Sequence, residues 1–229
     1  MFGAGGLLFS FVLLFPVPQS FARRVLRILF RFFVWLGGAT RLFRVEISGE
    51  DRRRLAAVSG AVAVSNHQTL IDAVILISLL GDSVCVTKAA VSRNPFMRVV
   101  ARSILVVNDG PVAVMRHAVR YLSGGVNVLV FPEGTRVPKD APSHVFRRGA
   151  AHIAVQANAP VVLVRLDCDA GVLAKGQPWW DVGDRTVTYR VSVAGTVAPD
   201  SFPRRAPGAG SRQAAAALTD MMHEGIFGP

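Results

Sequence analysis

The chain has 229 residues, of which 51% are hydrophobic, and it carries a formal net charge of +11 at pH 7. A chain of this length can bury one good core, so one domain with an appendage is expected. Its two cysteines, Cys85 and Cys168, both lie in apolar stretches. This excludes a scaffold held by several disulfides and favours buried, reduced thiols.

The N-terminal segment, residues 1–44, holds much of the positive charge, because it contains six arginines and no acidic residue. Residues 1–22 are uncharged and apolar, but Pro16 and Pro18 interrupt them. The uninterrupted part is shorter than the ~20 residues that cross a bilayer comfortably. It also lacks the basic start and small-residue cleavage site of a secretory signal, so we expect no cleaved signal peptide.

A basic amphipathic helix is predicted within residues 20–44. On a helical wheel most of its arginines fall within a sector of about 100°, and most of its large apolar side chains lie opposite. Leu26, Phe30 and Val34 interrupt the arginine face. The pattern is typical of a helix that lies in a membrane interface. A single membrane span and a solvated basic helix packed on the domain stay open as alternatives.

From about residue 45 onward, short apolar runs rich in β-branched residues alternate with helical stretches. This alternation predicts an α/β fold with a mostly parallel central sheet flanked by helices. Strands are predicted at 44–48, 61–65, 83–87, 104–107, 126–131, 161–166 and 186–194. Helices are predicted at 70–80, 95–102, 112–122, 149–158 and 212–224.

The first chemical motif is SNHQTLID at residues 65–72, between a predicted strand and a predicted helix. On one helix His67 and Asp72 would lie about 140° apart, so they face each other only if His67 lies in the loop. Asp72 would then orient the imidazole and leave its other nitrogen free to act as a base. In the alternative interpretation, Thr69 and Asp72 form a capping box with no chemical role.

The second motif is FPEGTR at residues 131–136, directly after a predicted strand. Loops at this end of an α/β sheet usually bind ligands. Gly134 permits a close approach of the backbone, Thr135 offers a hydroxyl, and Arg136 offers a fork suited to phosphate or carboxylate. The alternative is an ordinary strand-end turn with a surface ion pair between Glu133 and Arg136.

Together, the N-H-x-x-x-x-D motif and the F-P-E-G-T-R motif resemble the glycerolipid acyltransferases, typified by the 1-acylglycerol-3-phosphate acyltransferases. The resemblance covers about residues 45–195, and the N-terminal segment is similar to the membrane-docking helices of bacterial members. It implies two N-terminal membrane-associated helices over residues 1–44 and an acyltransferase catalytic domain over residues 45–229. It also implies a place on the cytoplasmic face of the inner membrane, with membrane lipids as partners.

The resemblance also implies roles for individual residues. His67 would be the general base that deprotonates the acceptor hydroxyl, and Asp72 would orient it. The acceptor-binding loop would consist of Glu133, Gly134, Thr135 and Arg136. Lys88 resembles a lysine that precedes the family's second sequence block. The acceptor would be a lyso-lipid such as 1-acylglycerol-3-phosphate, and the donor would be acyl-CoA or acyl-carrier protein.

The sequence does not favour a metal site, a cofactor site or a nucleic-acid site. We expect no metal and no cofactor, because the other histidines lack ligand spacing and are assigned to the surface or the core. These are His117, His144, His152 and His223. Nucleic-acid binding is disfavoured, because the arginines follow a strongly apolar segment and are not interleaved with a binding module.

One departure from the family pattern concerns the acceptor. The family's second block usually reads G-x-x-F-I-D-R, whereas residues 103–109 read SILVVND, so Asp109 stands in place of an arginine that helps to hold the acceptor phosphate. A phosphate-free lyso-lipid, such as an acylated amino acid or a specialised lipid, is therefore an open alternative. Other basic residues that could compensate are Lys88, Arg93, Arg98, Arg102, Arg147 and Arg148. The alternative for the scattered arginines is an ordinary solvated surface.

Two other classes of protein compete with the acyltransferase interpretation. A hydrolase would use the same His67 and Asp72 pair on water, but the sequence holds no G-x-S-x-G nucleophile elbow. A non-catalytic membrane-binding relative would be free to lose the pair, and both residues are present.

Overall fold

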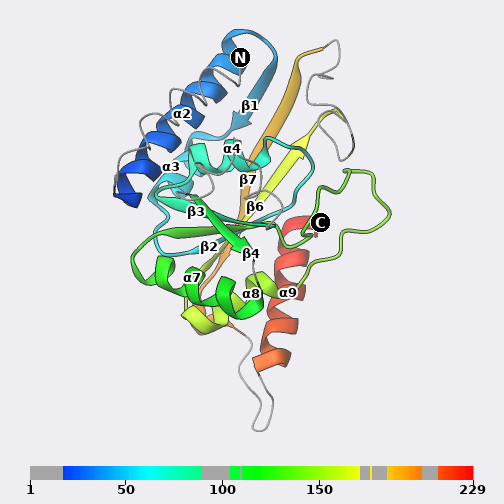
Figure 1. Ribbon diagram of the computed structural model, residues 1–229. Helices are drawn as coiled ribbons and strands as arrows, with labels where there is room; N and C mark the ends of the chain where they lie inside the picture. Colours follow the sequence, from blue (N-terminus) through cyan, green and yellow to red (C-terminus); the bar gives the residue numbers. More distant parts are fainter. Residues whose placement is uncertain are drawn as a thin grey trace.

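A computed structural model of the chain describes residues 18–88, 104–108, 110–170, 176, 185–202 and 211–228 (Figure 1). Some sequence-based predictions lie outside these residues. They concern the apolar segment before Pro18, the helix at 95–102, the charge reversal at Asp109, and the compensating arginines Arg93, Arg98 and Arg102.

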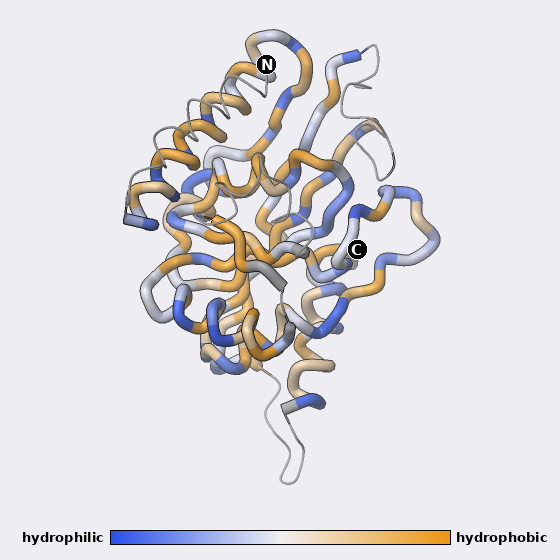
Figure 2. The backbone as a smooth tube through the Cα atoms, in the orientation of Figure 1, coloured by the Kyte–Doolittle hydropathy of each residue, from blue (hydrophilic) through white to orange (hydrophobic). Residues whose placement is uncertain are grey.

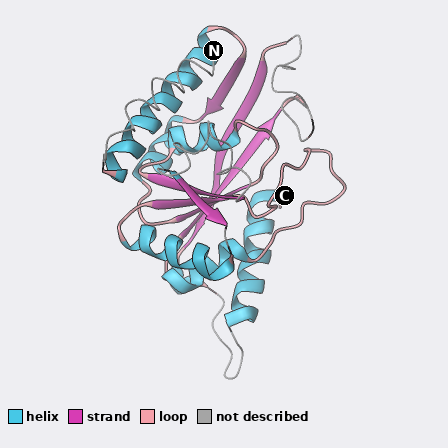
Figure 3. Cartoon of the chain, in the orientation of Figure 1, coloured by secondary structure: helices cyan, strands magenta, loops and turns pink. Residues whose placement is uncertain are grey.

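Seven strands form one sheet in the order β1-β7-β6-β2-β5-β3-β4 (Figure 3). Every neighbouring pair is parallel except β6 with β7. This confirms the mostly parallel sheet that the sequence predicts. In chain order the strands are β1 Phe43–Ile47, β2 Val62–Ser65, β3 Ser83–Lys88, β4 Leu105–Asn108, β5 Asn127–Val130, β6 Val161–Cys168 and β7 Val187–Val197.

Helices cover both faces of this sheet, and each face has its own core cluster. Ala61 and Ala63 pack into the cluster with α2, α3 and α4, whereas Val62 and Val64 pack into the cluster with α7, α8 and α9. This alternation follows from the two-residue period of a strand. The helices are α2 Gln19–Ala39, α3 Gly49–Ala57, α4 Asp72–Leu79, α7 Pro111–Ser123, α8 Gly149–Ala157 and α9 Ser211–Phe227.

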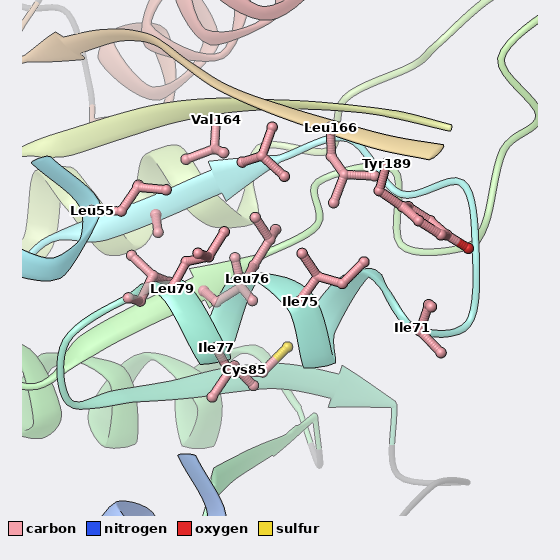
Figure 4. Packing of buried hydrophobic residues seen from close by; sticks show 14 of the residues in the cluster. Leu55, Ile71, Ile75, Leu76, Ile77, Leu79, Cys85, Val164, Leu166 and Tyr189 are labelled. Carbon is pink, nitrogen blue, oxygen red and sulfur yellow. The ribbon is translucent and has the colours of Figure 1, made fainter. Parts of the chain in front are cut away.

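The central strands are apolar on both faces, which agrees with the hydropathy along the backbone (Figure 2). Every residue of β2 and of β5 is buried. Figure 4 shows part of the first cluster, in which Ile75 and Leu76 of α4 lie beside Val164 and Leu166 of β6. Two-sided burial is the expected environment of central parallel strands, and it fixes the strand ends that carry the two motifs.

Helix α3 was not predicted, because its sequence has almost no apolar periodicity. Leu55 is its one buried residue. The helix is specified by its beginning instead. The Ser48 hydroxyl accepts a hydrogen bond from the Asp51 amide at 2.9 Å, and Glu50 and Asp51 place negative charge in the first turn. Both features stabilise a helix N-terminus.

Helix α2 packs on the domain through the residues that interrupt its arginine face on the wheel. Leu26 is buried, and Phe30 and Val34 pack against the first core cluster. Arg23 lies on the same side and forms a two-point ion pair with Asp82, with both N–O distances at 2.8 Å. The interruptions are therefore the docking surface of the helix.

The opposite side of α2 leaves a ridge of large apolar side chains exposed. We call this the α2 ridge, and it comprises Phe21, Ile28, Leu29, Phe32 and Trp35. Arg24 and Arg31 are exposed on the same helix. In the described part of the chain, no helix is both long and apolar enough to span a bilayer.

Candidate active site

The two motifs meet at one edge of the sheet because β2 and β5 are parallel neighbours. β2 ends at Ser65 and β5 ends at Val130, so the segments that follow both leave the sheet at its carboxyl edge. Asn66 fixes the first segment to β6. Its side-chain amide donates to the Leu166 carbonyl at 2.7 Å and accepts from the Leu166 amide at 2.9 Å.

His67 lies in the loop and Asp72 is the first residue of α4, as the five-residue spacing predicts. His67 Nδ1 is 2.9 Å from Asp72 Oδ2, and the Asp72 side chain is fully buried. A carboxylate accepts, so Nδ1 carries the proton and Nε2 is the acceptor nitrogen. Among the described residues Nε2 has no hydrogen-bond partner, and the His67 side chain is 20% exposed.

The Asp72 carboxylate is held from several sides. Its Oδ2 accepts from the backbone amides of Gln68 at 2.7 Å and Thr69 at 2.8 Å, and its Oδ1 accepts from the Thr69 hydroxyl. Thr69 does not cap the helix, because α4 begins three residues later. The predicted capping box is therefore not formed, although Asp72 does reach back to the preceding amides. These donors fix the carboxylate that orients the imidazole.

The segment after β5 holds His67 from the other side. The His67 ring stacks on Phe131, with ring centroids 4.2 Å apart. The Val137 amide donates to the His67 carbonyl at 2.7 Å, and the His67 amide donates to Glu133 Oε2 at 2.7 Å. The segment after β5 thus contacts His67 through Phe131, Glu133 and Val137.

Glu133 lies inside the site, and its side chain is only 1% exposed. Its second oxygen, Oε1, is 2.7 Å from His144 Nδ1. Burial raises the pKa of Glu133, and the hydrogen bonds from His144 and His67 oppose this shift. A buried carboxylate that faces these donors is not the surface ion pair of the alternative interpretation. Contact between Glu133 and an acceptor stays a prediction.

The other residues of the predicted acceptor loop are partly exposed. Gly134 has φ of +68°, which disfavours other residues there. A Cβ on Gly134 would lie 3.3 Å from Nε of Arg147, so this guanidinium lies against the loop. Thr135 and Arg136 are half-buried beside it. Lys88 is the last residue of β3, which is parallel to β5, so its backbone lies at the same edge of the sheet.

His144 is the residue of this site that sequence reasoning missed. It lies in an irregular segment eleven residues after Glu133, where no periodicity or motif marks it. Its ring stacks on Phe227 of α9, with centroids 4.4 Å apart. A histidine on an unpatterned segment acquires its partners only through the fold, so no sequence signal identifies it.

Neither cysteine fits the role of a nucleophile. Both are buried, and burial raises the pKa of Cys85 to about 12 and that of Cys168 above its ordinary value. A reactive thiol needs the opposite shift, because the thiolate is the nucleophile. No cluster of three metal-ligating side chains occurs among the described residues.

The family follows from comparison with known proteins. The family model named Acyltransferase matches residues 44–167, which is more than half of the chain and includes both motifs. The chain therefore belongs to the Acyltransferase family.

Two relatives within this comparison carry the same enzyme name. The chain is 30% identical over 137 residues to the 1-acyl-sn-glycerol-3-phosphate acyltransferase of Limnanthes alba, covering 56% of this chain and 46% of the relative. The protein of the same name from Limnanthes douglasii is 29% identical over the same share of each chain. The chain thus spans about half the length of these curated relatives.

The fold also matches a solved structure. The 1-acyl-sn-glycerophosphate (LPA) acyltransferase PlsC from Thermotoga maritima superposes with a TM-score of 0.63 at 21% identity, covering 96% of this chain and 87% of that one. At this identity the match establishes the fold, which is the α/β sheet with flanking helices.

Proposed function

We propose that the chain is an O-acyltransferase that moves a fatty acyl chain from a thioester to the hydroxyl of a lyso-lipid such as 1-acylglycerol-3-phosphate. One observation carries the proposal. His67 Nδ1 donates to the buried Asp72 carboxylate at 2.9 Å, while its Nε2 is left without a described partner at the edge of the sheet. The names of the two plant relatives support the substrate class.

The chemistry follows from the tautomer. His67 Nε2 accepts the proton of the acceptor hydroxyl as the hydroxyl oxygen attacks the thioester carbonyl carbon. The carbon–sulfur bond then breaks, and the proton on Nε2 passes to the departing thiolate. Asp72 stabilises the imidazolium formed between these steps. Acyl-CoA and acyl-carrier protein both supply such a thioester.

Two arginines at the loop support an acidic acceptor headgroup. Arg136 belongs to the half-buried loop, and the guanidinium of Arg147 lies against Gly134. Arg147 has no acidic partner among the described residues, and its amide donates to the Pro132 carbonyl at 2.9 Å, which fixes its backbone beside the loop. Arginine suits phosphate because its planar fork donates two parallel hydrogen bonds.

The test is transfer of a labelled acyl group from acyl-CoA to 1-acylglycerol-3-phosphate in detergent micelles. We expect His67→Ala to lower kcat by about 10²–10⁴-fold, the usual contribution of a positioned base. His117→Ala is the control, because His117 is exposed on α7. Undiminished transfer by a folded His67→Ala protein would exclude the base.

The same assay tests the acceptor. The phosphate acceptor is compared with a monoacylglycerol, using Arg147→Met and, as a control, Arg116→Met at an exposed arginine of α7. Loss of a hydrogen bond to a charged group predicts a KM about tenfold higher for the phosphate acceptor in Arg147→Met alone. Equal use of both acceptors by the unmodified chain would exclude phosphate recognition, and better use of the monoacylglycerol would assign a phosphate-free substrate instead.

We also propose that the α2 ridge places the enzyme on an anionic membrane surface. Trp35 is 63% exposed and Phe32 is 55% exposed, and exposed Arg24 and Arg31 share the helix. Apolar side chains on one face beside arginines are the pattern of interfacial helices. Each such arginine adds about 1 kcal/mol of attraction to anionic lipid.

Flotation with liposomes of phosphatidylglycerol and phosphatidylcholine measures this attachment. The double variant Phe32→Ser/Trp35→Ser should bind about a hundredfold more weakly, because the burial of two aromatic side chains in the lipid is lost. Val112→Ser is the control, since Val112 is 73% exposed on α7, on the other face of the sheet. Equal binding by the double variant and the control would contradict attachment through the ridge.

A further inference from the structure

A second histidine–carboxylate pair, His144 and Glu133, is joined to His67 by a hydrogen bond. The two oxygens of Glu133 face two different segments of the chain. Oε2 accepts from the His67 amide at 2.7 Å, and Oε1 is 2.7 Å from His144 Nδ1. The Glu133 side chain is 1% exposed and the His144 side chain 12% exposed. Glu133 thus links the backbone of the candidate base to the ring of His144.

His144 is in turn fixed by the C-terminal helix. Its ring stacks on Phe227 at 4.4 Å between centroids, with the planes inclined by 29°. Phe227 also contacts Phe146 at 5.7 Å and His223 at 5.2 Å, so it belongs to an aromatic cluster between α9 and the segment before α8. In Figure 1 the end of α9 lies beside this segment.

Both ring nitrogens of His144 face other parts of the chain. Nδ1 faces Glu133, and Nε2 is 3.5 Å from the Lys139 carbonyl oxygen. Its ring face is covered by Phe227. A ring held in this way orients its partner and does not meet the reacting atoms.

Glu133 depends on such a partner. A buried carboxylate without enough donors is costly, and a carboxylate that loses one partner becomes free to turn or to take up a proton. Either change would release the His67 amide. The amide belongs to the residue whose imidazole is the candidate base, and small misplacements of catalytic groups cost large factors in rate.

We propose that His144 is a positioning residue, which holds Glu133 against the backbone amide of His67 and so keeps the base in place. The proposal rests on the proposed function for its effect on rate. It assigns to the α9 end a part in the site, because Phe227 supports the His144 ring. The residue acts through Glu133 and His67 and does not touch the acceptor.

Two variants separate the hydrogen bond from the stacking. His144→Phe keeps an aromatic ring against Phe227 and removes the donor to Glu133. His144→Asn keeps a donor near the position of Nδ1 and removes the ring. The matched control is His223→Phe, since His223 contacts the same aromatic cluster at Phe146 and Phe227, whereas the described hydrogen-bond partners of Glu133 are His67 and His144.

We expect His144→Phe to lower kcat about tenfold with KM changed by less than about twofold, because a displaced base slows the chemical step without altering acceptor binding. His144→Asn should recover kcat to within about threefold, and His223→Phe should match the unmodified chain. Thermal unfolding of each variant shows that it is folded. Unchanged kcat in folded His144→Phe, or an equal loss in His223→Phe, would overturn the proposal.

A second measurement does not depend on activity. In an amide proton spectrum of the isotope-labelled full chain, the His67 amide should lie downfield, as expected for an amide that donates to a carboxylate. It should move upfield in His144→Phe and stay in place in His223→Phe. A resonance that does not move in His144→Phe overturns the positioning role. Absence of transfer by the unmodified chain, with the shift change present, removes the proposed function alone.

Discussion

Two histidine–carboxylate pairs lie at the same edge of the sheet, and they differ in what surrounds the second ring nitrogen of each histidine. The His67–Asp72 distance is 2.9 Å and the His144–Glu133 distance is 2.7 Å, and both carboxylates are buried. In the first pair, the second ring nitrogen has no described partner. In the second pair, that nitrogen faces a backbone carbonyl and the ring is stacked on Phe227.

The surroundings of each histidine–carboxylate pair, more than the two residues themselves, decide its role. Asp72 takes its other hydrogen bonds from its own loop, at Gln68 and Thr69, so it serves one imidazole. Glu133 divides its oxygens between two segments and connects them. The first pair suits proton transfer, and the second suits support.

The largest expected effect is that of Asp72→Asn, which tests whether Asp72 supports proton transfer by His67. The substitution places an amide NH2 among donors from Gln68 and Thr69, and it removes the charge that stabilises the imidazolium. We expect kcat to fall by about 10²–10⁴-fold. Because buried donors lose their acceptor, the free energy of unfolding should fall by about 1–3 kcal/mol. Steady-state kinetics and denaturant unfolding measure the two effects.

The same two measurements on Glu133→Gln are the reference for that prediction. Gln still presents an oxygen to the His67 amide and an NH2 group to Nδ1 of His144, so the connection between the two segments is kept. If Glu133→Gln lost as much kcat as Asp72→Asn, the two carboxylates would have equivalent roles, and the distinction between them would fail.

The first pair could be predicted from the sequence, and the second could not, because their partners differ in separation along the chain. His67 and Asp72 are five residues apart, so strand, loop and helix signals place them together. Glu133 and the His67 amide are 66 residues apart, and they meet only because β2 and β5 are adjacent. Local sequence patterns therefore predict neither hydrogen-bond partner of Glu133, the His67 amide or His144.

The fold shows the same division. Strands β1 to β7 were predicted to within a few residues, since apolar β-branched runs mark central strands. Helix α3 was missed because its capping residues specify it without an apolar face. The wheel alone did not show which side of α2 packs on the domain, because Leu26, Phe30 and Val34 interrupt a polar face there and prove to be tertiary contacts in the structure.

The smallest expected effect is the pH dependence of stability in Glu133→Gln. Burial raises the pKa of Glu133 above its ordinary value of 4.5, so the folded chain binds this proton more tightly than the unfolded chain does. The stability that this group contributes is fully present below pH 4.5 and is lost as pH rises through the folded pKa. Gln does not titrate, so the unmodified chain should lose stability relative to Glu133→Gln over this interval, with kcat within about threefold near pH 7. Denaturant unfolding of both proteins at a series of pH values measures the difference. A difference that moves the other way with pH would mean that the hydrogen bonds from His144 and His67 outweigh the effect of burial on the pKa of Glu133.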